Sequence, residues 1–159
     1  MKFIVTSTIA APVAQVWDVV ADFGRLAEWS PTVADSRVVD GSEPRVGLER
    51  TLRRAGSQRV VRERIAAYEP DCHLAHEVVE GARFPLKKLR LDWTLQRLGE
   101  GTLVSVAVDF KIYLPYGPVG LPVWLVARRK LRKEITAALH ALESQFANHP
   151  PAGQAIVVA

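Results

Sequence analysis

The sequence predicts an α+β fold in which a seven-stranded antiparallel sheet is covered by one long C-terminal helix, with two short helices after the first strand. Apolar and polar residues alternate along seven segments, which is the period of a half-buried strand. From residue 120 to residue 147 the apolar residues recur at helical spacing instead. A sheet with one apolar face must be covered, and this helix is the only element long enough to cover it.

The N-terminal part of the chain contains the first strand and the two short helices. Alternating apolar residues over 3–9 predict the strand. Pro12 suits the first position of a helix, which helical apolar spacing extends over 12–21. Asp22 is expected to cap a second helix at 23–29, and the Ser-Pro pair that follows ends it. Six further strands are expected at 33–40, 46–54, 59–68, 73–80, 87–97 and 102–114.

The hairpin at 48–65 predicts an ion pair in the protein interior. Arg50 shares its strand face with two leucines, and Glu63 shares its face with a valine and an isoleucine. A two-residue turn with Gly56-Ser57 at its centre has glycine first, which suits a type II′ turn. This register pairs the apolar residues with one another and places Arg50 opposite Glu63.

The last two strands and the long helix are also specified by their apolar residues. A two-residue turn at Gly99-Glu100 pairs the apolar residues of 87–97 with those of 102–114, and a shift by one residue would pair apolar with polar throughout. The helix at 120–147 has one apolar stripe, formed by Leu121, Trp124, Leu131, Ile135, Leu139, Leu142 and Phe146.

The composition is that of one globular domain. The 159 residues are 48% hydrophobic, and we expect a ligand-binding domain at 1–148 and a loosely ordered tail at 149–159. The net charge of +4 favours anionic partners in general without specifying one. The single cysteine, Cys72, excludes an internal disulfide and fits a reducing cytoplasm. The start of the chain matches a signal peptide poorly, and we expect a cytoplasmic protein.

Four stretches of the chain resemble the helix-grip (SRPBCC) superfamily, which includes polyketide cyclases, START-type lipid-transfer proteins and Bet v 1-like plant proteins. They are APVAQVWDVVADFGRLAEWSPTV, VGLERT, VVRERIAAYEP and the terminal helix, and the resemblance covers residues 3–147. It implies a curved antiparallel sheet that grips the long helix and leaves an apolar cavity between them. Members bind lipids, polyketides, isoprenoids or plant hormones; some catalyse aldol cyclisation or dehydration, and many catalyse nothing.

The resemblance also implies which side chains face the cavity. Trp29 lies where the family has its cavity entrance, and it either gates the entrance or simply packs behind the end of a helix. His76 departs from the aromatic residue that the family usually has there, which makes this cavity more polar. The cavity positions are Glu63, His76, Val78, Leu89, Leu91 and Trp93.

We therefore predict binding or transport of a small hydrophobic ligand with one polar head, without a cofactor. Arg50, Glu63 and His76 would address the polar head. The alternative for Arg50 and Glu63 is an ion pair that satisfies only itself. The apolar body of the ligand would contact Leu89, Leu91, Trp93, Val108, Phe110, Leu131 and Ile135.

An enzymatic alternative is a polyketide cyclase or dehydratase, in which His76 or Glu63 moves protons next to a carbonyl group. A metal site at Cys72, His73 and His76 is not expected, because residues 73 and 76 of one strand face opposite sides of the sheet.

A further alternative is docking to a membrane or a protein through residues 115–133, where an apolar patch adjoins the basic run RRKLRK. The simpler interpretation is that Val123, Trp124 and Val126 pack on the protein itself. Nucleic-acid binding is not expected, because no known module pattern is present. The sequence does not specify an oligomeric state.

Overall fold

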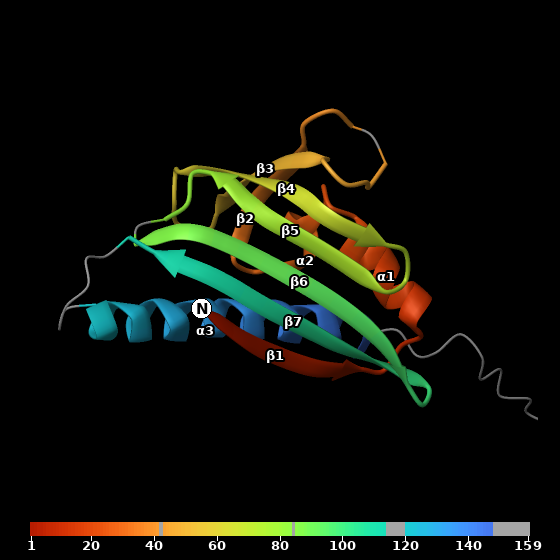
Figure 1. Ribbon diagram of the computed structural model, residues 1–159. Helices are drawn as coiled ribbons and strands as arrows, with labels where there is room; N and C mark the ends of the chain where they lie inside the picture. Colours follow the sequence, from red (N-terminus) through yellow and green to blue (C-terminus); the bar gives the residue numbers. More distant parts are fainter. Residues whose placement is uncertain (42, 84, 114–119, 148–159) are drawn as a thin grey trace, which may run out of the picture.

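The structure is a computed structural model that describes residues 1–41, 43–83, 85–113 and 120–147. It confirms the predicted fold: one seven-stranded antiparallel sheet in the order β1-β7-β6-β5-β4-β3-β2, with a long C-terminal helix (Figure 1). The strands are β1 (Lys2–Ile9), β2 (Val33–Val38), β3 (Glu49–Arg54), β4 (Val60–Glu69), β5 (His73–Glu80), β6 (Leu86–Leu98) and β7 (Gly101–Ile112). The helices are α1 (Val13–Ala21), α2 (Leu26–Trp29) and α3 (Gly120–Ala147). The tail predicted at 149–159 lies outside the described residues.

The helices cover the inner face of the curved sheet unevenly. In Figure 1 the sheet arches over α3, which lies against β1. The short helices α1 and α2 pack near the C-terminal half of α3, so that end of the inner face is filled. The other end, near the start of α3, has no short helix over it. The short helices therefore cover one end of the inner face and not the other.

Helix α2 is shorter than predicted, at Leu26–Trp29 instead of 23–29. The cause is Phe23, whose side chain is inserted into the core with 2% of its surface exposed. Its carbonyl oxygen accepts a hydrogen bond from Arg50 Nη1 at 2.9 Å, which replaces the bond that a helix would supply. Packing of one aromatic ring therefore overrides the local preference for a helix.

The register of the β3–β4 hairpin is as predicted, and its turn is not. Arg50 pairs with Glu63 in the ladder, and both side chains face the interior with 4% and 5% of their surfaces exposed. The amide of Ser57 donates to the carbonyl of Arg54, so Ala55 and Gly56 are the central residues of the turn. Gly56, with φ at +72°, is therefore the second central residue and not the first. The alternation of apolar residues fixes the register whatever the turn type.

The β6–β7 hairpin confirms its predicted register, since Leu98 pairs with Gly101 across a two-residue turn. In α3 the predicted stripe is buried from Leu131 to Leu142 and half-buried at Trp124 and Phe146, but Leu121 is 64% exposed. The stripe fails there because the first turns of α3 project beyond the part of the sheet that could cover them. The largest fully buried side chains of β7 and α3 are Val104, Val106, Val108, Phe110, Leu139 and Leu142.

Candidate functional site

A cleft of about 820 Å³ opens between the sheet and the N-terminal half of α3. Its walls come from the β3–β4 turn, the segment between β5 and β6, and one face of α3 from Val123 to Glu134. Its apolar lining includes Val61, Val78, Leu86, Leu89 and Leu131. This volume lies within the usual range of small-molecule sites, about 300–1,000 Å³. The cleft is therefore large enough to take a ligand without rearrangement of the fold.

Next to the cleft on the same face of the sheet is a buried polar cluster of Arg50, Glu63, His76 and Trp93. The guanidinium of Arg50 donates twice to Glu63 Oε2, from Nε at 2.9 Å and from Nη2 at 2.5 Å. Its carbon Cζ lies 3.9 Å from the centre of the Phe23 ring, so the cation also packs on an aromatic face. All five N–H groups of an arginine need partners when it is buried, and three of them are satisfied here.

The contacts of His76 specify its tautomer. Trp93 Nε1 donates to His76 Nε2 at 3.2 Å. An indole nitrogen can only donate, so Nε2 must be the unprotonated acceptor and the neutral ring carries its proton on Nδ1. Nδ1 lies 3.2 Å from Glu63 Oε2, in an orientation that is poor for a hydrogen bond. His76 is thus held between a donor and a carboxylate.

Burial and charge act in opposite directions on the carboxyl group of Glu63. Burial by itself raises the pKa of this carboxyl, since the charged form loses its hydration. The positive charge of Arg50 and the contact with His76 lower it by more, and the net pKa lies well below the usual range of a glutamate. Glu63 is therefore ionised at neutral pH and forms a buried ion pair with Arg50.

The polar cluster lies around a second, very small pocket of about 20 Å³. Arg50, His76, Trp93 and Trp29 line this pocket together with apolar residues of α1 and the loop that follows it. Space of this size is sufficient for about one water molecule. The two pockets have no lining residue in common. The polar cluster is therefore next to the cleft and not in its wall.

The structure distributes the predicted site residues over three places. Val78, Leu89 and Leu131 line the cleft. Trp29, Arg50, His76 and Trp93 line the small pocket. The residues that line neither pocket are Glu63, Leu91, Val108, Phe110 and Ile135. Whether any of them contacts a ligand stays a prediction.

Five charged residues lie at the cleft, and the sequence predicted a functional role for only one of them, Lys130, as part of the basic run at 128–133. The other residues are Arg54, Arg59, Arg83 and Glu134. Arg54 and Glu134 form an ion pair that joins β3 to α3 across the cleft. The sequence carried a signal for Arg54, which is four residues after Arg50 and so shares its strand face. The other four lie in a turn, a loop and a helix, where strand periodicity gives no direction.

The two histidines of β5 lie on opposite faces of the sheet, as predicted. His73 contacts Asp92 at 3.2 Å on the outside, while His76 faces inward to Glu63. Among the described residues no cluster of three or more potential metal ligands occurs.

The start of the segment predicted to dock, 115–119, lies outside the described residues. In the described part, Val126 is 66% exposed, contrary to the interpretation that it packs on the protein. Arg128 lies over the rings of Phe3 and Trp124, which covers part of Trp124. No helix in the described ranges has the length and apolar character needed to cross a bilayer.

Comparison with known proteins places this geometry in a family. The sequence profile of the family described as polyketide cyclase/dehydrase and lipid transport matches residues 1–147. No curated protein matches the chain in sequence. Among solved structures, an aromatase/cyclase from a Streptomyces species superposes with a TM-score of 0.79 at 20% identity, covering 96% of this chain and 98% of that one.

Two further solved structures have the same fold. A START superfamily protein from Mycobacterium smegmatis superposes with a TM-score of 0.72 at 18% identity, covering 92% of this chain and 97% of that one. A major latex-like protein from Panax ginseng superposes with a TM-score of 0.69 at 18% identity and the same coverage, 92% and 97%. The profile match over nearly the whole chain and the helix-grip fold together show that this chain belongs to the polyketide cyclase/dehydrase and lipid transport family.

Proposed function

We propose that this protein binds a small hydrophobic molecule in the cleft between the sheet and α3, and that it carries or sequesters this molecule without changing it. The observation that supports this most directly is the cleft itself, about 820 Å³ in volume. Its apolar side chains come from β4, β5, β6 and α3, so a ligand there would be surrounded by four elements of the fold. Burial of apolar ligand surface supplies the affinity, at roughly 25 cal/mol per Å².

The positions of the acid–base groups favour binding over catalysis. A general acid or base must be within hydrogen-bond reach of the atom it protonates or deprotonates. His76 lines only the pocket of about 20 Å³, which is too small for a substrate. Its Nε2 already accepts from Trp93, and Glu63 already accepts twice from Arg50. A substrate in the cleft therefore has neither group next to it.

The second candidate is a cyclase or dehydratase, which the cluster itself supports. An imidazole beside an ionised carboxylate is a common acid–base arrangement. Here it would act only if Trp93 released His76 Nε2 toward the cleft. Turnover of a polyketide-like substrate that disappears in His76→Ala, with the fold intact, would favour this candidate over the first.

The test of ligand binding uses two neighbouring valines of β5. Val78 lines the cleft, whereas Val79 is 39% exposed. Val78→Phe places a ring in the cleft, and Val79→Phe places the same ring outside as the matched control. The probe is N-phenyl-1-naphthylamine, a neutral apolar dye that becomes fluorescent when it is buried. Native mass spectrometry of the purified protein would show in parallel whether a small molecule co-purifies.

We expect the wild type and Val79→Phe to bind the dye with equal affinity. Val78→Phe should bind about tenfold more weakly, which corresponds to roughly 55 Å² of lost apolar contact at ~25 cal/mol per Å². Equal affinity in all three proteins would show that the dye binds outside the cleft. Absence of binding to the wild type, with no co-purified molecule, would contradict the proposal.

A further inference from the structure

The charges around the cleft are unbalanced. The described residues that line it include four cations, Arg54, Arg59, Arg83 and Lys130, and one anion, Glu134. Glu134 is paired with Arg54, which leaves three cations without a carboxylate partner among the described residues. Among the described residues, the guanidinium of Arg59 donates only to the carbonyl oxygen of Ala82, at 3.3 Å. The cleft is therefore apolar in its lining and positively charged at its rim.

The outer face of the same sheet is different. Arg64 pairs with Glu77 at 2.8 Å, and Arg90 pairs with Asp92 at 2.9 Å. Arg62 lies 3.5 Å from Glu80. These three arginines of the outer face have cross-strand or same-strand carboxylates, as is usual for a solvated sheet surface. Among the described residues, cations such as Arg53 and Lys133 also have no carboxylate partner, so the feature that distinguishes the cleft is the grouping of three such cations around one apolar opening.

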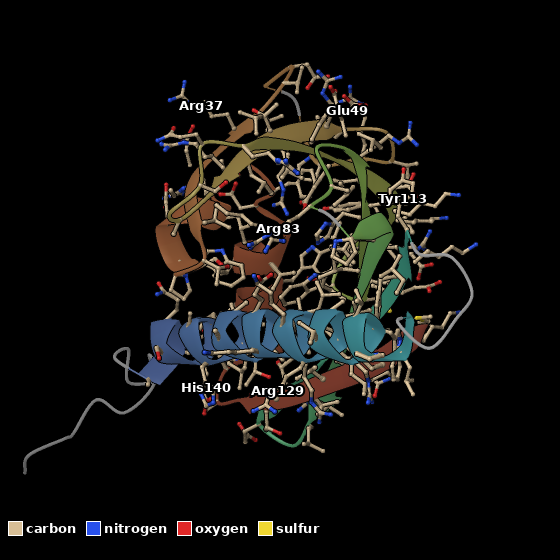
Figure 2. All side chains as sticks on the ribbon, turned by 90° about the vertical axis from the view of Figure 1, so that its left-hand side faces the viewer. Arg37, Glu49, Arg83, Tyr113, Arg129 and His140 are labelled. Atoms are coloured by element: carbon tan, nitrogen blue, oxygen red, sulfur yellow. The ribbon has the colours of Figure 1, made fainter. Side chains whose placement is uncertain are left out.

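The three cations come from three separate segments that the fold brings together. Arg59 precedes β4, Arg83 lies between β5 and β6, and Lys130 is on α3. Figure 2 shows Arg83 over the space between the sheet and α3, whereas Arg129 and His140 lie on the far side of α3. Arg83 and Lys130 therefore face one opening from opposite walls, with the apolar lining behind them.

We propose that the ligand of the cleft is an anionic amphiphile, with an apolar body against Val78, Leu89 and Leu131 and an oxyanion at the rim among Arg59, Arg83 and Lys130. This rests on the proposed function, since it names the class of molecule that the cleft takes. Arginine and lysine are the side chains that bind carboxylates and phosphates, and the anion supplies the partner that the described chain lacks. An apolar molecule without a charge would leave these exposed cations to water alone.

The test compares two dyes that share one apolar body. 1-Anilinonaphthalene-8-sulfonate carries a sulfonate, and N-phenyl-1-naphthylamine is the same ring system without it. The double variant Arg83→Gln, Lys130→Gln removes two charges at the rim. The control Arg129→Gln, Lys133→Gln removes two charges from α3 at exposed positions that do not line the cleft. Both variants therefore have the same net charge.

We expect the rim variant to bind the sulfonate dye about 5- to 20-fold more weakly, the usual scale for two partly solvated ion pairs. Its affinity for the neutral dye should change by less than about twofold, and the control should keep both affinities. Wild-type affinity for the sulfonate dye should also fall as salt rises, because partly exposed charges are screened. Dodecanoate and dodecyl phosphate should displace the neutral dye better than dodecanol, and the better of the two identifies the preferred head.

Failure of this inference is distinguishable from failure of the proposed function. If the wild type binds the neutral dye and the rim variant loses nothing on the sulfonate dye, the cleft binds apolar molecules without regard to charge and the inference is wrong. An equal loss of affinity for the sulfonate dye in the control variant would also overturn the inference. The attraction would then come from the net charge of the protein and not from the cations at the rim. If neither dye binds the wild type, the proposed function itself is contradicted.

Discussion

The strongest prediction concerns the ion pair between Arg50 and Glu63. The two side chains are joined by hydrogen bonds of 2.9 and 2.5 Å to one oxygen, and 4% and 5% of the residue surfaces are exposed. Replacing either residue with leucine leaves the other charge buried without its partner. This should reduce the free energy of unfolding by about 3–5 kcal/mol. At a urea m-value of roughly 2 kcal/mol/M, the midpoint falls by about 2 M.

The double variant Arg50→Leu, Glu63→Leu should be destabilised much less than the sum of the two. It has no unpaired charge, and its remaining cost comes from the carbonyl oxygen of Phe23, which loses its hydrogen bond from Arg50. Buried polar groups without partners cost about 1–3 kcal/mol. The coupling between the two substitutions should therefore exceed about 3 kcal/mol, where independent sites would add.

The assay is urea unfolding of the four proteins, followed by tryptophan fluorescence and circular dichroism, beside titration with the two dyes. Dye affinity should change by less than about twofold in the double variant, since neither side chain lines the cleft. If Arg50 instead binds the polar head of a ligand in a wet cavity, Arg50→Leu would cost little stability and would weaken binding of the sulfonate dye. Small, additive stability losses would refute the reasoning from burial.

Two further predictions concern pH and a glycine. Because the folded pKa of Glu63 lies below its unfolded value, the stability that its ionised form contributes is present at neutral pH and is lost as pH falls below about 4 to 5. The difference in free energy of unfolding between wild type and Glu63→Gln should accordingly shrink from pH 7 to pH 3, and a constant difference would contradict the assignment. Gly81→Ala should cost more than about 1–3 kcal/mol in thermal or urea unfolding, because φ is +77° and a Cβ would lie 2.3 Å from the carbonyl oxygen of Val60. Gly41→Ala is its control, since φ is +65° and, apart from its chain neighbours, no described residue has an atom within 4 Å of the added Cβ. An equal cost at both sites would show that contact with Val60 does not matter.

The sequence was sufficient for the fold and for the inward direction of the ion pair. Alternation with a period of two assigns each strand residue to a face, and the short turns leave few registers open. That is why Arg50 could be placed opposite Glu63, and Leu98 opposite Gly101. The contact between His76 and Trp93 was not predictable in this way. It depends on the register of β5 against β6, and the segment between these strands is too long to fix it.

The charged rim was missed for a related reason. Arg59, Arg83 and Lys130 lie in a turn, a loop and a helix, so no single period relates them. Only the curvature of the sheet and the position of α3 bring them to one opening. Periodicity could show which face is internal, but it could not show which end of that face the short helices fill.

This uneven filling explains how one sheet face holds both a buried ion pair and an open cleft. Each of three neighbouring strands carries two of these residues on the inner face. The pairs are Arg50 and Arg54 on β3, Glu63 and Val61 on β4, and His76 and Val78 on β5. The first member of each pair belongs to the polar cluster, and the second lines the cleft. Phe23 of the segment after α1 packs on both Arg50 and His76, with ring centroids 5.8 Å apart in the second contact. The polar cluster thus lies at the boundary where packing by the N-terminal helices ends and the cleft begins. It is expected to hold the inner wall of the cleft in place through the chain of contacts from Phe23 to Trp93, while the cations at the rim remain available to a ligand.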